Sequence, residues 1–164
     1  MKVAPTLLLT RPETRSSALR AELAGYGYAV YNAPMLNIYH HACDDAPSPH
    51  GYQAIIITSA NAAAALRTLG APADLPVFAV GDASAQTAKG YGMRHVTSAG
   101  GDVRDLCALI RARCTPSAGA LLYIRGRDVA GDLAADLHTA GWDVESWIAY
   151  RAESVGAMPS PAAG

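Results

Sequence analysis

The sequence predicts an α/β protein built on a parallel sheet, and three observations lead to this class. Short apolar runs suited to buried strands alternate along the chain with amphipathic segments suited to helices. A pattern of glycine and an aromatic residue joins a helix to a strand three times, at residues 24–30, 88–94 and 139–144. Apolar residues make up 51% of the 164 residues, enough to bury a sizeable core. Alternating strands and helices imply parallel strands with right-handed crossovers.

The predicted strands share apolar, often β-branched residues bounded by turn residues. They lie at residues 7–10, 28–32, 54–58, 76–80, 93–97, 120–124 and 143–150. The run 54–58 is the strongest and is typical of a strand buried on both faces. Residues 33–39 continue in an extended form, but Pro34 argues against a central position in the sheet.

The predicted helices begin at residues that favour helix starts. Pro12 and Glu13 open the first, Leu19 and Leu23 give it an apolar face, and the glycines at 25 and 27 end it. Further helices are predicted at 62–69, from 81–84 to about 89, after Asp102 as N-cap, and up to 139. Residues 40–51 form a polar loop, and residues 152–164 are predicted to be a disordered tail.

Composition and missing motifs exclude several function classes. The net charge of −1 lacks the basic excess typical of nucleic-acid binding. Three cysteines without C-x-x-C spacing indicate reduced thiols, a cytoplasmic location and no zinc site, and the His40-His41 pair is interpreted as part of a solvated loop. No apolar stretch approaches the roughly 18 residues of a membrane span. Neither a dinucleotide fingerprint nor a P-loop is present.

Ligands of open parallel sheets bind beyond the carboxyl ends of the strands. Four such ends carry hydroxyls, helix-start N–H groups or guanidinium groups, at residues 10–12, 58–61, 81–84 and 125–128. Together these groups suit an anionic ligand. The alternative is that each Ser, Thr or Asp at these ends is only a helix cap.

Taken in order, these motifs resemble the uroporphyrinogen-III synthase family. The matching pieces are Leu9-Thr10-Arg11-Pro12, Gly25-Tyr26-Gly27-Tyr28, Ala33-Pro34-Met35-Leu36, Ile57-Thr58-Ser59-Ala60-Asn61-Ala62, Val80-Gly81-Asp82-Ala83-Ser84, Gly100-Gly101-Asp102, Ile124-Arg125-Gly126-Arg127-Asp128 and Ile148-Ala149-Tyr150-Arg151. The resemblance implies a flavodoxin-like parallel-sheet domain inserted into a split α/β domain. Residues 1–34 would be the opening β-α-β unit of the split domain, and residues 35–151 the inserted domain with its connecting strands. The remainder of the split domain is expected to be absent, because the family's returning segment would begin just after residue 151.

The resemblance also implies an activity. Family members cyclise the linear tetrapyrrole hydroxymethylbilane, losing water and inverting the last pyrrole ring, in haem biosynthesis and without cofactor or metal. Tyr150 matches the family's candidate proton donor, and a tyrosine is protonated at neutral pH. Its alternative role is that of a strand-end residue without chemistry.

The resemblance places substrate contacts on the four strand ends, largely through backbone N–H groups. The substrate-binding residues it implies are Arg11, Ser59, Ala60, Asp82, Ala83, Ser84, Arg125 and Arg127. We expect a cytoplasmic synthase impaired by truncation, with no nucleic-acid or membrane partner. The family is usually monomeric, and self-association of this chain is the other expectation. The alternative function is a non-catalytic remnant or binding module.

Overall fold

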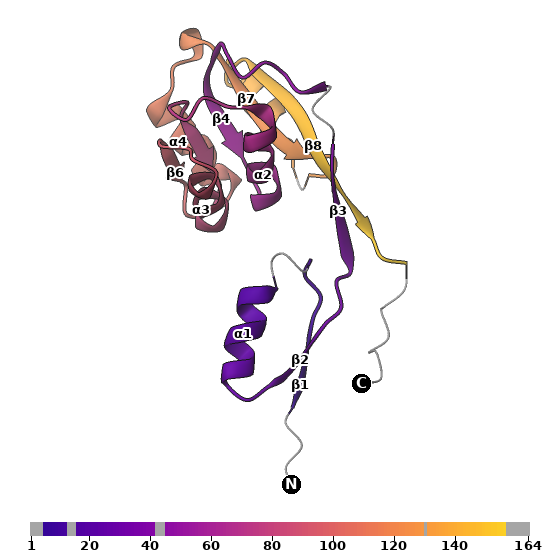
Figure 1. Cartoon of the computed structure of the whole chain (residues 1–164). Helices are drawn as coiled ribbons and strands as arrows, with labels where there is room; N and C mark the ends of the chain where they lie inside the picture. The colour runs from indigo at the N-terminus through magenta and orange to yellow at the C-terminus, as the bar shows by residue number, and fades with distance from the viewer. Residues whose placement is uncertain (1–4, 13–15, 42–44, 130, 157–164) are drawn as a thin grey trace. The chain divides into compact units, whose positions relative to one another are not determined.

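The computed structural model describes residues 5–12, 16–41, 45–129 and 131–156. The chain divides into two compact units, Met1–Tyr39 with Ala152–Gly164, and His40–Arg151. Figure 1 shows the strands and helices of both.

The described residues of the His40–Arg151 unit form five parallel strands, the last of which continues past Arg151. They are β4 (Tyr52–Ile57), β5 (Val77–Ala79), β6 (Val96–Ser98), β7 (Ala120–Gly126) and β8 (Val144–Ser154), in the order β8-β7-β4-β5-β6. The α/β class and the parallel sheet predicted from the sequence are confirmed. β4, the first strand of this unit, lies between β5 and β7, which are the second and the fourth strands. In flavodoxin the first strand lies between the second and the third.

Helices cover both faces of this sheet. They are α2 (Ala60–Leu69), α3 (Asp82–Gly90), α4 (Val103–Arg113) and α5 (Leu133–Thr139), and a 3-10 turn, η3, spans Pro116–Ala118. Ile55 and Ile57 pack with α2 and α3, while Ile56 packs with α4 and α5. Successive strand residues point to opposite faces, and all three isoleucines are fully buried. This two-sided burial is the reason for the continuous β-branched run.

The predicted cap of α4 is confirmed. The carboxylate of Asp102 accepts hydrogen bonds from the N–H groups of Arg104 (2.7 Å) and Asp105 (3.2 Å). The Asp105 carboxylate in turn accepts from the Asp102 N–H at 3.0 Å, which completes a capping box.

In the other unit, β1 (Thr6–Leu9) pairs in parallel with β2 (Ala29–Asn32), and α1 (Ser17–Gly25) connects them. These two strands form a sheet of their own. The helix begins at Ser17 rather than at Pro12, which corrects the predicted start. The Ser16 hydroxyl instead donates to the carbonyl oxygens of Arg11 (3.1 Å) and Pro12 (3.2 Å). Glu13 lies outside the described residues. Leu19 is 38% exposed, and α1 has no buried residue.

Strand β3 (Leu36–His40) lies at the edge of the larger sheet, next to β8. The His41 N–H donates to the Ala149 carbonyl at 2.9 Å, and the Val155 N–H donates to the Met35 carbonyl at 3.0 Å. Residue numbers along β3 rise from 35 to 41 while those of their partners in β8 fall from 155 to 149, so the two strands are antiparallel.

This pairing corrects the boundary of the predicted tail. β8 extends to Ser154, although a disordered tail was expected from residue 152. The hydrogen bonds to β3 hold these residues in the strand, and this long-range pairing leaves no local sequence signal. Residues 157–164 lie outside the described residues.

Candidate functional site

A cavity of about 430 Å³ opens at the carboxyl ends of β4 and β7. These neighbouring strands are separated in the chain by β5 and β6, so the direction of strand progression reverses between them. Such a switch point is where doubly wound sheets bind ligands. The cavity is lined by Thr58, Ser59, Val80, Val103, Tyr123, Gly126, Asp128, Val129, Gly131, Asp132, Leu133, Asp136 and Tyr150.

Ser59 occupies the turn from β4 into α2 and is the N-cap of that helix. Its Oγ accepts a hydrogen bond from the Ala62 N–H at 3.0 Å. The same oxygen lies 3.0 Å from the hydroxyl oxygen of Tyr150. Ser59 therefore caps α2, which is the alternative role expected for such strand-end residues, and it also contacts Tyr150, the candidate proton donor.

Tyr150 lies across Gly126, which is buried near the carboxyl end of β7. A Cβ atom at Gly126 would lie 2.7 Å from Tyr150 Cζ and 2.9 Å from its hydroxyl oxygen. The register between β7 and β8 shifts here, so that Gly126 pairs with Tyr150. The His40 ring lies 6.2 Å from the Tyr150 ring, centroid to centroid. Glycine at position 126 thus makes room for the tyrosine ring.

A second phenol–hydroxyl pair lies in the same cavity. The Thr58 Oγ1 and Tyr123 hydroxyl oxygens are 3.3 Å apart. Tyr123 is only 3% exposed, and burial raises its pKa above 10.0. The Tyr123 phenol is therefore protonated at neutral pH and available as a hydrogen-bond donor.

One side of the cavity is acidic. Asp128, Asp132 and Asp136 line it, and no basic residue does so among the described part of the chain. Asp132 also caps α5, since its carboxylate accepts from the Ala135 N–H at 3.0 Å. Carboxylates accept hydrogen bonds from N–H groups and repel other carboxylates. This side of the cavity therefore favours a part of a ligand that carries N–H groups.

Four further predicted residues lie at the starts of helices α2 and α3. Ala60 is the first residue of α2, and Asp82, Ala83 and Ser84 form the first turn of α3. The N-cap of α3 is Gly81, and no side chain caps this helix. Its first N–H groups are therefore suited to an anion, although none of these four residues lines the cavity.

The predicted arginines lie outside the cavity lining. Arg125 Nη1 donates to the carbonyl oxygens of Gly126 and Arg127, both at 3.2 Å. Arg127 Nε lies 3.6 Å from an Asp128 carboxylate oxygen, and both side chains are exposed. Arg11 follows β1 in the other unit and is exposed. Of the predicted site residues, the cavity brings together Ser59 and Tyr150.

Sequence reasoning did not select Thr58, Tyr123, Gly126 or the aspartates as site residues. Thr58 and Gly126 belonged to strand-end motifs that it did identify, so position alone offered a signal for them. Tyr123 lies inside an apolar strand run and resembles a core residue. Its hydroxyl became informative only when the sheet placed β7 beside β4.

The described residues contain neither a membrane-spanning helix nor a metal-binding cluster. None of their helices is long and apolar enough to cross a membrane. They also contain no group of three or more His, Cys, Asp or Glu side chains able to hold a metal ion.

A doubly wound parallel sheet with hydroxyl groups gathered at its switch point defines an α/β protein of the class that binds ligands beyond the carboxyl ends of its strands. The family model described as uroporphyrinogen-III synthase HemD matches residues 17–162, so the chain belongs to that family. No curated protein sequence matches the chain significantly.

Solved structures of two bacterial enzymes share the fold. A mutant uroporphyrinogen III synthase from the extremely thermophilic bacterium Thermus thermophilus has 17% identity and a TM-score of 0.62, over 93% of this chain and 64% of that chain. The uroporphyrinogen-III synthetase of Helicobacter pylori has 15% identity and a TM-score of 0.62, over 94% of this chain and 64% of that chain. The chain thus spans about 64% of the length of these structures.

Proposed function

We propose that this chain acts in uroporphyrinogen-III synthesis, cyclising hydroxymethylbilane with inversion of the last pyrrole ring and loss of water. The observation that carries the proposal is the family match over residues 17–162. The contact between Ser59 and Tyr150 at the switch point supports it, because these side chains provide hydroxyl groups where a doubly wound sheet binds its ligand.

Tyr150 is the proposed proton donor. Its phenol protonates the hydroxyl group of the hydroxymethyl substituent, which leaves as water. Ser59 positions the phenol by donating a hydrogen bond to the phenol oxygen, and it keeps its own proton. The Ala62 N–H donates a hydrogen bond to Ser59 Oγ and thereby polarises the Ser59 hydroxyl. Ring closure later releases a proton from pyrrole carbon, which restores the Tyr150 phenol.

The substrate's carboxylates bind at the helix starts in this proposal. Ser59 and Ala60 offer N–H groups at α2, and Asp82, Ala83 and Ser84 offer those of α3. Ser84 is 6% exposed and contributes through its backbone. The Asp82 carboxylate stays in solvent, away from the substrate's own carboxylates.

The charged side chains complete the proposed substrate site. Arg125 and Arg127 add positive charge for the substrate's carboxylates, and Arg11, in the other unit, stays a predicted substrate contact. The acidic side of the cavity, formed by Asp128, Asp132 and Asp136, accepts pyrrole N–H groups and keeps the substrate's carboxylates away from it.

The domain assignment and setting are parts of the same proposal. Residues 1–34 are the opening β-α-β unit of a split domain, and residues 35–151 are the inserted domain with its connecting strands. The separate sheet formed by β1 and β2 supports this division. The reaction requires no cofactor and takes place in the cytoplasm on a free small molecule.

A non-catalytic binding module is the second candidate. It is favoured by the structural role of Ser59, whose hydroxyl caps α2, so that its contact with Tyr150 also fits a strand-end residue without chemistry. Such a module would bind tetrapyrroles without directing ring closure.

Product analysis separates the candidates. Purified chain is incubated with hydroxymethylbilane, and the type I and type III products are resolved by chromatography, with binding of the substrate measured in parallel. Type III product above the spontaneous background supports the synthase. Binding with type I product alone identifies a binding module. If the chain neither binds the substrate nor forms type III product, both candidates are refuted.

A further inference from the structure

A second cavity, of about 460 Å³, lies at the opposite end of the strands from the candidate active site. Its lining includes Pro76, just before β5, and Arg94 and His95, just before β6. The amino ends of β5 and β6 therefore form this corner of the unit. None of its lining residues belongs to the cavity at the switch point.

The floor of this corner is apolar. Phe78 pairs with Thr97 across the two strands, so alternation places both residues on one face of the sheet. Phe78 packs with Leu106 and Ile110, and α4 thus covers this face. The helix ends at Arg113, which also lines the cavity. The end of α4 leaves the corner open beside Pro76, Phe78 and Thr97.

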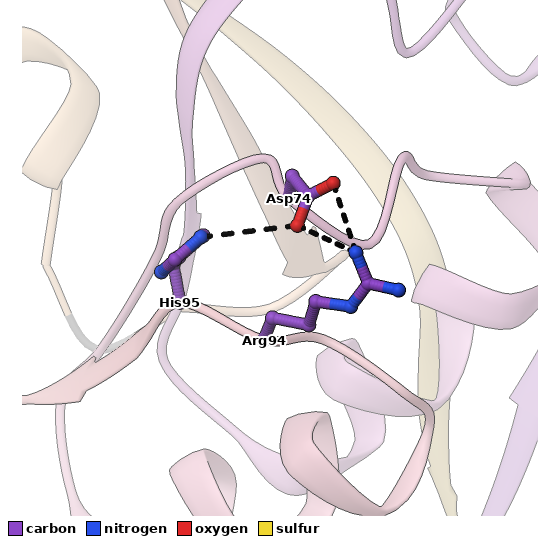
Figure 2. A network of polar contacts seen from close by, with 3 residues as sticks. All are labelled: Asp74, Arg94 and His95. Atoms are coloured by element: carbon purple, nitrogen blue, oxygen red, sulfur yellow. Dashed lines mark hydrogen bonds and ion pairs between the residues drawn. The ribbon is translucent and has the colours of Figure 1, made fainter.

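The rim of this corner is basic. Arg94, His95 and Arg113 line it, and no described residue of the lining is acidic. Asp74 contacts this rim: its carboxylate oxygens lie 2.9 and 3.1 Å from Arg94 Nη1, and one of them lies 3.8 Å from His95 Nε2. Figure 2 shows that this carboxylate faces one guanidinium nitrogen, while the other nitrogens of Arg94 lie away from it.

One carboxylate does not neutralise the corner. Asp74 supplies a single negative charge, whereas Arg94 and Arg113 supply two positive charges. Arg94 is also fixed at its backbone, where its N–H donates to the Ala73 carbonyl at 2.8 Å. The result is a positioned guanidinium group with further donors, in the same cavity as a second arginine.

From this juxtaposition we propose that the corner binds a small organic anion, an oxyanion group on a flat apolar body. The oxyanion accepts hydrogen bonds from Arg94 and Arg113, and the Thr97 hydroxyl adds a neutral donor. The apolar body lies against Pro76, which is half-buried, and against the small exposed part of Phe78. The oxyanion is either a carboxylate or a phosphate, since both match the guanidinium geometry. This site is independent of the proposed synthase activity.

The test uses benzoate, phenyl phosphate and inorganic phosphate as probes at low ionic strength, where exposed charges are weakly screened. Binding to the full chain is followed by two-dimensional NMR of the backbone amides and by calorimetry. We expect benzoate or phenyl phosphate to shift the amides of Val96 and Thr97, and the stronger of the two identifies the oxyanion. Inorganic phosphate should bind at least about fivefold more weakly than phenyl phosphate, because it lacks the apolar body.

Matched variants assign the site. Arg113→Gln and Arg94→Gln should each weaken the stronger probe about tenfold, the loss expected for one charge-assisted hydrogen bond. Arg67→Gln, at the end of α2, is the control and should leave binding unchanged. The amide spectrum of each variant shows whether it is folded. Equal affinity in wild type and Arg113→Gln, or amide shifts confined to other strands, overturns the proposal.

Discussion

Replacing Gly126 with alanine tests the packing that places Tyr150 in the site. The new Cβ would lie 2.7 Å from Tyr150 Cζ, at least 0.7 Å inside the ordinary contact limit of 3.4 Å. The ring must move, and the contact between Ser59 Oγ and the Tyr150 hydroxyl is then lost. Overpacking costs about 1–3 kcal/mol, and a lost hydrogen bond about 1 kcal/mol. We expect the free energy of unfolding to fall by roughly 2–4 kcal/mol.

Urea unfolding of a double-mutant cycle measures this cost. Gly126→Ala is compared in the wild-type chain and in a Tyr150→Ala background, where the new methyl group no longer meets a ring. The destabilisation should largely disappear there. Gly90→Ala is the matched control, because its Cβ would meet no atom within 4 Å. The same loss in both backgrounds, or a neutral Gly126→Ala variant, would refute the reasoning.

Three further predictions concern other parts of the unit. Asp102→Ala removes the cap of α4 and should cost about 1 kcal/mol in urea unfolding, whereas Asp102→Ser should retain most of the stability; equal costs would contradict the cap's role. Burial, together with a hydrogen bond to Glu145, raises the pKa of Tyr52 from 10.0 to about 12. The neutral phenol is favoured in the folded chain, so its stabilising contribution is complete below pH 10 and is lost between about pH 10 and 12. Tyr52→Phe should lack that part of the loss, and phenolate absorbance during the titration checks it; identical pH profiles would count against it. If the chain is a synthase, Tyr150→Phe should lower type III formation about a hundredfold, as for loss of a general acid. Tyr123→Phe, whose hydroxyl already contacts Thr58, should lower it less, and the reverse ranking would make Tyr123 the donor.

The fold was predictable where local patterns and burial agree. The run 54–58 indicated a strand buried on both faces, and Ile55, Ile56 and Ile57 are fully buried in β4. Asp102 indicated a helix start and caps α4. Errors fell where long-range contacts decide the structure. The last residues of β8 continue the strand beside β3, and no local pattern specifies this pairing.

The candidate site was predictable only in part for the same reason. Strand-end motifs located Ser59, and the family resemblance located Tyr150. The sequence contains no signal for strand order, however, so it could not show that β4 and β7 are neighbours. That neighbourhood is what brings Tyr123 to Thr58 and turns an apparent core tyrosine into a cavity residue. The role of the arginines in substrate binding stays a prediction, and the cavity lining itself is acidic.

The change of partner along β8 has a consequence for backbone amide exchange with solvent. β7 pairs with β8 from Val144 to Tyr150, and beyond that residue the hydrogen bonds run toward β3. Amides that donate to the buried strand β7 open only with much of the unit, whereas a two-stranded ribbon opens locally at small cost. Deuterium uptake should therefore be slow for the β8 amides before Tyr150 that donate to β7, and much faster for the amides from there to Val155. The proton donor of the proposed reaction lies at the step between these two rates.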